Sequence, residues 1–241
     1  MSIEALATLM PYPIKFESRR RNIQRFLNLE SLKIETLWFP LIEIILKEKF
    51  KPKQPLKVAI DRTQWRDTNV FMISLIWDKR AIPLYWQLLD KRGSSNLEEQ
   101  QSLITPILEL LKDYEIIILG DREFGSVKLG QWLCQQQVKF VLRIKQERYI
   151  QSDEEDYTRL SQLGLLPGTR FYLRGVKVTK QKGLGTFNVA AYYWQSRKPR
   201  NFSSWMKASS DRIPHVMLNG AQLSEASLGF RLKCDRTNIK I

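Results

Sequence analysis

Residues 115–145, EIIILGDREFGSVKLGQWLCQQQVKFVLRIK, contain the strongest strand signal in the chain. Consecutive aliphatic residues from Ile116 to Leu119 lead into Gly120 and Asp121, as in a strand buried on both faces. The stretch 125–137 has helical character, and 139–145 predicts the next strand. A strand, a helix and a strand in this order predict an α/β core with a mixed sheet and flanking helices.

Upstream, three apolar runs predict three strands joined by short turns: 56–61 (LKVAID), 71–77 (FMISLIW) and 81–89 (AIPLYWQLL). Short connections favour an antiparallel meander, with Asp78–Arg80 as one turn. The stretch 95–114 then predicts a helix capped by Ser95 or Asn96.

Composition shifts divide the chain into four expected parts. Residues 1–54 predict a helical region with two helices broken near Pro40, and 55–146 the α/β core. Residues 147–197 predict an inserted β-hairpin subdomain, and 198–241 form a tail without clear periodicity. The arginines near the start either contact phosphates or belong to a solvated helix face; they are Arg19, Arg20, Arg21 and Arg25.

The charge balance favours a polyanionic partner. The 241 residues include 39 Lys and Arg against 25 Asp and Glu, a formal net charge of +14. Such a surplus attracts nucleic acid through counterion release, although ribosomal and membrane-surface proteins share it. With 43% hydrophobic residues and seven tryptophans, the chain has ample material for a packed core.

Several protein classes are disfavoured. Cys134, Cys234 and the single His215 match no zinc-ligand spacing, which favours a reduced, intracellular protein. The N-terminus lacks the apolar core of a signal peptide, and no window predicts a membrane span. We therefore expect a cytoplasmic, nucleoid-associated protein that does not contact the membrane.

Two carboxylates stand where apolar runs end: Asp61 closes VAID and Asp121 closes IILGD. If the two strands are neighbours, their carboxylates converge on one edge and can bind Mg²⁺ or Mn²⁺, which take oxygen ligands. Taken singly, each aspartate is more simply a turn residue. Each, however, is followed by an arginine and, a few positions on, by an aromatic residue, which suits a site that handles phosphates.

IDRTQW (60–65) and LGDREF (119–124) together resemble the DDE transposases of the bacterial insertion-sequence-4 type, over roughly residues 20–197. The resemblance implies a ribonuclease-H-like fold and double-stranded DNA as partner, both transposon ends and target. It also allows a homodimer assembled on DNA.

The resemblance assigns roles to individual residues. It makes Asp61 and Asp121 catalytic metal ligands for Mg²⁺ or Mn²⁺. Arg62, Thr63, Trp65 and Arg122 would line the site or contact DNA, and Lys145 either contacts phosphate or is solvated. Glu123 is interpreted as a supporting or structural partner that points away from Asp121 if the strand continues, with Phe124 beside it.

One departure from the family pattern concerns the third carboxylate. A helix carrying Tyr, Arg, Glu and Lys is expected after the hairpin, but no such pattern follows Trp194, and Glu225 in LSEASLGF lacks the flanking residues. We therefore expect either an active metal-dependent transposase or an inactive, truncated copy. The alternatives are a non-catalytic DNA-binding remnant and, more distantly, an unrelated basic nuclease.

Overall fold

The computed structural model describes most of the chain: residues 2–65, 68–78, 80–89, 93–151, 156–163, 170–181, 183–192 and 215–219. It divides into two compact units, Met1–Lys51 and Pro52–Ile241. The expected end of the helical region, residue 54, lies a few residues beyond this boundary. No helix among the described residues is long and apolar enough to cross a bilayer.

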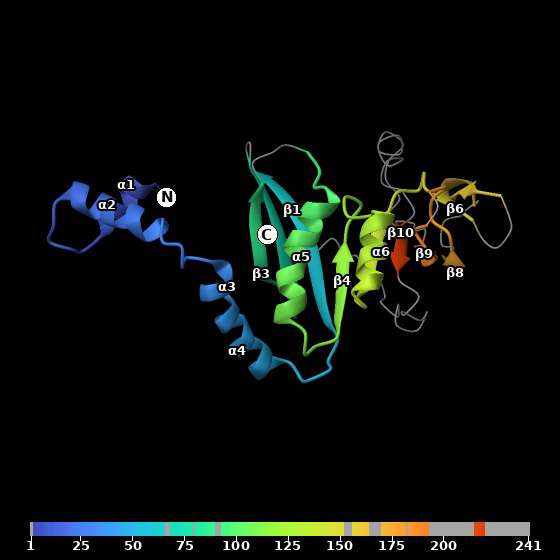
Figure 1. The fold of residues 1–241 in the computed structure, drawn as a ribbon, viewed down its shortest axis with the longest axis horizontal. Helices are drawn as coiled ribbons and strands as arrows, with labels where there is room; N and C mark the ends of the chain where they lie inside the picture. Colours follow the sequence, from blue (N-terminus) through green and yellow to red (C-terminus); the bar gives the residue numbers. More distant parts are fainter. Residues whose placement is uncertain are drawn as a thin grey trace, which may run out of the picture. The chain divides into compact units, whose positions relative to one another are not determined.

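The first unit is helical throughout (Figure 1). Its helices are α1 (Ile3–Leu9), α2 (Phe16–Leu27), α3 (Ile34–Leu37) and α4 (Phe39–Lys49). The predicted break near Pro40 is present, because Trp38 separates α3 from α4, but the region before it does not form one helix. The stretch before Pro40 is already interrupted between α2 and α3, and Pro40 itself lies in the first turn of α4, where its missing N–H costs no helical hydrogen bond.

The second unit is built on a mixed sheet (Figure 1). Its first strands form the expected antiparallel meander of β1 (Leu56–Trp65), β2 (Thr68–Trp77) and β3 (Arg80–Leu89). β4 (Ile116–Gly120) then pairs in parallel with β1, and β5 (Lys139–Ile144) in parallel with β4. The resulting order β3-β2-β1-β4-β5 is compatible with a ribonuclease-H-like fold.

Two helices connect these strands and cover one face of the sheet, side by side (Figure 1). α5 (Leu97–Leu110) begins with a reciprocal capping box between Asn96 and Glu99, so Asn96 rather than Ser95 is the N-cap. α6 (Val127–Gln135) follows the turn after β4. Their inward residues join the β-strand side chains in a dry core; fully buried examples are Leu103, Ile104, Ile107, Leu129 and Leu133.

The β-rich stretch after β5 extends the same sheet. β8 (Arg170–Val176) and β9 (Phe187–Tyr192) form the expected hairpin, and β10 (His215–Asn219) pairs with both β9 and β5. The sheet thereby reaches eight strands, while β6 (Tyr149–Ile150) and β7 (Thr158–Arg159) form a separate small ladder followed by the short helix η1 (Leu160–Gln162). The tail expected to lack periodicity thus contains a strand, and its other residues lie outside the described ranges.

Candidate active site

Asp61 lies on β1, and Asp121 directly follows the end of the neighbouring parallel strand β4. The β1–β4 register ends with Ile60 opposite Gly120, so the next residue on each chain is an aspartate. The two carboxyl groups are close enough that the charge of Asp121 contributes to raising the pKa of Asp61, after the larger effect of burial.

β1 does not end at Asp61, contrary to the prediction. It continues to Trp65, because Arg62–Trp65 pair with Thr68–Phe71 of β2. What ends at this point is the pairing with β4, since β4 finishes at Gly120. Asp61 therefore lies where β1 loses one neighbour, which keeps its carboxyl group half-buried rather than enclosed.

The second motif folds into a tight turn rather than a continued strand. An Asp121 carboxylate oxygen accepts a hydrogen bond from the Glu123 N–H at 2.9 Å, and the Asp121 carbonyl accepts one from Phe124 N–H at 3.1 Å. This aspartate turn fixes the start of the loop. Glu123 was expected to point away from Asp121 if the strand continued. Because β4 ends at Gly120, this expectation does not apply.

Arg62 and Glu123 join the two motifs directly. Arg62 Nε lies 2.6 Å from Glu123 Oε1, and each side chain is only 17% exposed. The same carboxylate oxygen accepts hydrogen bonds from the N–H and the hydroxyl of Ser95, at 3.2 and 3.3 Å. Arg62 Nη1 also donates to Asn69 Oδ1 at 3.0 Å and to the Gly93 carbonyl at 2.6 Å. The guanidinium is thus engaged by three segments of the protein.

The remaining predicted residues differ in their exposure. Phe124 is fully buried and stacks on Phe71, with ring centroids 5.4 Å apart. Thr63 and Arg122 are exposed, as is Lys145 directly after β5. The Trp65 side chain lies outside what the structure describes.

The partners of Arg62 and Glu123 were missed in the sequence analysis. Asn69 is fully buried at the start of β2, and Ser95 was considered only as a helix cap. A buried asparagine in an apolar strand is a signal that could have been followed, because such a group needs a hydrogen-bonding partner. Nothing in the sequence pointed to Gly93 as an acceptor.

The donor set suits one hard cation. In the described part of the chain, each of the two carboxylates accepts one hydrogen bond, from Arg62 N–H at 2.8 Å and from Glu123 N–H at 2.9 Å, which leaves oxygen lone pairs for a metal. No cluster of three potential metal-ligating residues occurs among the described residues. Two carboxylates with water completing the shell fit Mg²⁺ or Mn²⁺.

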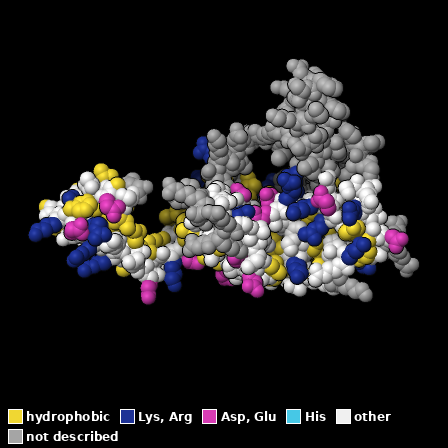
Figure 2. Space-filling model, turned by 90° about the horizontal axis from the view of Figure 1, so that it is seen from above, with side chains coloured by type: hydrophobic (Ala, Val, Ile, Leu, Met, Phe, Trp, Pro, Cys, Tyr) yellow, Lys and Arg dark blue, Asp and Glu magenta, His cyan; other side chains and the backbone are white. Residues whose placement is uncertain are grey.

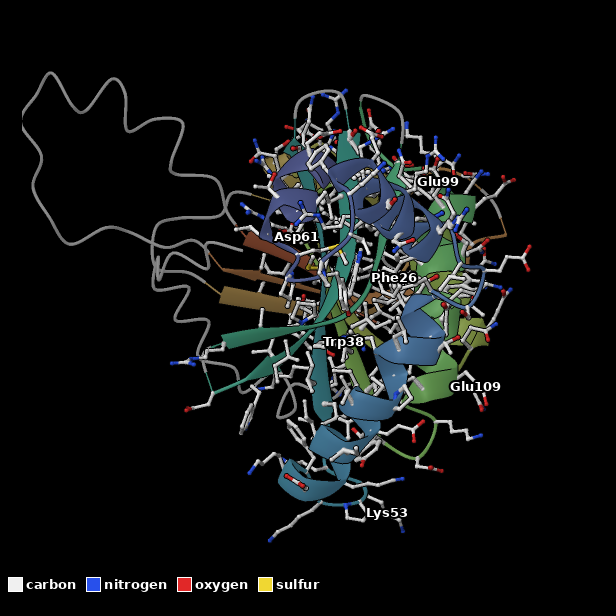
Figure 3. The ribbon with its side chains drawn as sticks, turned by 90° about the vertical axis from the view of Figure 1, so that its left-hand side faces the viewer. Phe26, Trp38, Lys53, Asp61, Glu99 and Glu109 are labelled. Atoms are coloured by element: carbon white, nitrogen blue, oxygen red, sulfur yellow. The ribbon has the colours of Figure 1, made fainter. Side chains whose placement is uncertain are left out.

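Helix α5 does not supply a third ligand. Figure 3 shows Asp61 well separated from Glu99 and Glu109. Glu99 is moreover committed to the capping box of α5, and Glu109 to an ion pair with Lys112. Glu225, the acidic residue considered in the tail, lies outside the described ranges.

Basic side chains gather around Tyr149, beyond the end of β5. Lys180 Nζ lies 4.3 Å from the ring centroid of Tyr149, and the Arg159 guanidinium lies 5.3 Å from it. The hydrogen bond that Arg159 donates to the phenol oxygen lowers the pKa of Tyr149. Figure 2, which looks onto the end of the sheet where β4 finishes, shows Lys and Arg side chains interspersed with acidic ones.

No family model and no curated protein matches this sequence. Among solved structures, the chain is similar to a piggyBac transposase in a synaptic complex with hairpin DNA, at 12% identity and a TM-score of 0.44, over 94% of this chain and 50% of that one. It is also similar to the Argonaute of Marinitoga piezophila in complex with a 5′ OH guide RNA, at 12% identity and a TM-score of 0.30, over 91% and 32% of the two chains. The chain therefore spans half or less of the length of these proteins.

Proposed function

We propose that this protein is a DNA transposase of the DDE type with a ribonuclease-H-like core, related to the insertion-sequence-4 group. The observation that carries the proposal is the parallel register of β1 and β4, which ends with Ile60 opposite Gly120, one residue before each aspartate. The order of the first five strands and the two sequence motifs that contain these aspartates support it.

Asp61 and Asp121 would hold the divalent cation. When bound, the ion would supply Lewis-acid activation of the attacking oxygen and charge neutralisation at the phosphate. The protein holds the two carboxylates in place through backbone N–H groups and keeps Asp61 half-buried, which strengthens its electrostatic interactions. The attacking group is water in cleavage and the freed 3′ hydroxyl in strand transfer.

The substrate we propose is double-stranded DNA, at transposon ends and at the target. The net charge of +14 supports a phosphate partner, and exposed cations such as Arg122 and Lys145 follow the strands that lead to the site. The basic cluster around Tyr149 offers further phosphate contacts. A homodimer on DNA is part of this proposal.

Cleavage of DNA by the full chain tests this function. We expect Mn²⁺- or Mg²⁺-dependent nicking of a duplex that carries transposon ends, abolished by Asp61→Asn and by Asp121→Asn. Glu115→Gln is the matched control, because it also converts a carboxylate to an amide, at the opposite end of β4, where Glu115 pairs with Lys139. Nicking that persists in both aspartate variants would refute the proposal.

A second function is favoured by one observation, the lack of a three-residue acidic cluster among the described residues. A chain with two metal-binding carboxylates could recognise DNA without cutting it, as a non-catalytic remnant. Tight, salt-sensitive binding to DNA together with no metal-dependent nicking would favour this function over the first.

A further inference from the structure

Arg62 follows the first aspartate directly, yet its guanidinium does not extend freely toward solvent. The Arg62 side chain is only 17% exposed, and its guanidinium donates hydrogen bonds to three acceptors. These acceptors come from three segments: β2, the stretch before α5, and the turn after β4.

We propose, building on the function above, that Arg62 and Glu123 are positioning residues that set the relative placement of Asp61 and Asp121 for metal binding. Arg62 is adjacent to Asp61, and its backbone N–H donates to the Asp61 carboxylate at 2.8 Å. Glu123 makes the equivalent contact on the other side, since its N–H donates to the Asp121 carboxylate at 2.9 Å. The side-chain ion pair at 2.6 Å therefore connects the two residues that orient the two ligands.

The Arg62–Glu123 ion pair joins two chain segments that lie beyond the end of the β1–β4 ladder. The β1–β4 ladder ends at Ile60 and Gly120, one residue before the aspartates. Beyond that point the Arg62–Glu123 bond replaces the missing ladder as a link between the segments. The N–H and the hydroxyl of Ser95 also donate hydrogen bonds to the Glu123 carboxylate, so a third segment supports the ion pair.

The geometry of the contacts requires arginine specifically. Nε binds Glu123 while Nη1 binds Asn69 and Gly93, a division that a planar guanidinium with several fixed donors allows. The ammonium of lysine is a compact charge and cannot span the same acceptors. We therefore expect Arg62→Lys to keep the charge but to restore only part of the function.

The direction in which Mn²⁺ affinity changes when Arg62 is removed distinguishes a positioning role from a purely electrostatic one. Removing a cation beside Asp61 should strengthen the binding of Mn²⁺ if only charge matters, because the local field becomes more negative. If Arg62 positions the ligands, its removal should weaken binding by about 10–100-fold, the usual effect of losing a group that orients a metal ligand. Substitution of Arg62 is thus more informative than substitution of Glu123, for which both explanations predict weaker binding.

The test is a calorimetric titration of the 241-residue chain with Mn²⁺ alone. It is run at a temperature where circular dichroism shows each variant to be folded. We expect Kd to rise about 10–100-fold in Arg62→Ala, to recover partly in Arg62→Lys, and to show non-additive effects in Arg62→Ala combined with Glu123→Ala. Lys139→Ala is the matched control: it breaks another 2.6 Å ion pair, at the opposite end of β4 and β5, and should leave Kd unchanged.

Each outcome has a distinct meaning. Binding in Arg62→Ala that is unchanged or tighter, while Asp61→Asn abolishes it, would overturn the positioning role and leave the proposed function intact. If Arg62→Ala does not fold, the double variant Arg62→Ala with Glu123→Ala, which leaves no unpaired buried charge, decides the question by the same change in Kd. Absence of Mn²⁺ binding in the unmodified protein would refute the proposed function, and the inference with it.

Discussion

Gly125 lies directly against the backbone of β5, so that a Cβ atom at this position would overlap the carbonyl oxygen of Arg143. The close approach brings the turn that carries Asp121 onto the neighbouring strand. Glycine is required here for space rather than for an unusual backbone angle, because the obstructing atoms are backbone atoms that cannot rotate away.

Gly125→Ala should therefore destabilise the protein by about 1–3 kcal/mol, the usual cost of forcing extra volume into a packed site. Urea unfolding measured by circular dichroism gives this free energy. Gly185→Ala is a suitable comparison, since Gly185 has a positive φ of 74° but open space around a Cβ; its cost should come from the backbone alone, about 1–2 kcal/mol. An unchanged unfolding midpoint in Gly125→Ala would contradict the close approach.

Phe124 should be a major contributor to stability. It is fully buried and stacks on Phe71, so Phe124→Ala should cost about 3–5 kcal/mol of unfolding free energy. Phe26, which is 56% exposed, provides the comparison: Phe26→Ala should change stability by less than about 0.5 kcal/mol. Similar losses in the two variants, measured by thermal or urea unfolding, would argue against the described packing of Phe124.

Asp61 should make stability depend on pH in a defined direction. Burial, reinforced by the charges of Asp121 and Glu123, raises the pKa of Asp61 above its ordinary value of 3.8. The folded state therefore binds this proton more tightly than the unfolded state, and stability is lost as pH rises from about 3.8 through the raised pKa. The loss should be below about 1 kcal/mol, because a half-exposed charge is screened by solvent.

In Asp61→Asn this pH dependence should disappear, and the metal-free variant should be slightly more stable than the unmodified protein at neutral pH. Urea unfolding at a series of pH values from about 4 upward, with a chelator present, measures both effects. A variant that is less stable than the unmodified protein at neutral pH would contradict the electrostatic origin of the shift.

With a divalent cation bound, the unmodified protein should be more stable than Asp61→Asn, the reverse of the order expected without metal. A ligand at about 100 times its Kd stabilises the folded state by about 2.7 kcal/mol, so saturating Mn²⁺ should raise the Tm of the unmodified protein but not that of Asp61→Asn or Asp121→Asn. Differential scanning fluorimetry with and without Mn²⁺ records the shifts. An equal rise in Tm in all three proteins would indicate that the cation binds elsewhere.

The basic cluster around Tyr149 should contribute to DNA affinity without sequence preference. Lys180→Ala should weaken binding uniformly across duplexes and reduce the slope of log K against log salt by about one phosphate contact. Lys112, an exposed lysine paired with Glu109 on α5, is the control. Fluorescence anisotropy over a series of salt concentrations distinguishes them, and identical slopes for Lys180→Ala and Lys112→Ala would exclude a DNA contact at Lys180.

The central strands were predictable because their patterns are local. Ile116–Leu119 have the composition of a buried strand, and the three upstream runs with short connections favoured a meander. The extension of β1 past Asp61 was not predictable from apolar residues, since Arg62–Trp65 are held by pairing with β2 rather than by burial. β10 was missed for a similar reason: it is a short strand whose partners, β5 and β9, are distant in sequence.

The residue types of the candidate site were predictable from the sequence, but the contacts between those residues were not. The two aspartates stand out because each follows an apolar run, but their adjacency depends on the parallel pairing of β1 with β4. The bond between Arg62 and Glu123 spans 61 positions and involves residues that the sequence analysis assigned to separate roles. Side-chain partnerships of this kind arise from the packing of the whole unit and leave no periodic signal.

Anomalous diffraction from crystals of the protein grown with Mn²⁺ decides whether Asp61 and Asp121 share one ion, because it locates the ion relative to both carboxylates. We expect one Mn²⁺ peak bonded to an oxygen of Asp61 and an oxygen of Asp121, at distances of about 2.0–2.3 Å, as is usual for small hard cations. A map in which the ion binds elsewhere, or in which the two carboxylates lie more than about 8 Å apart and cannot share it, would rule out a shared metal site.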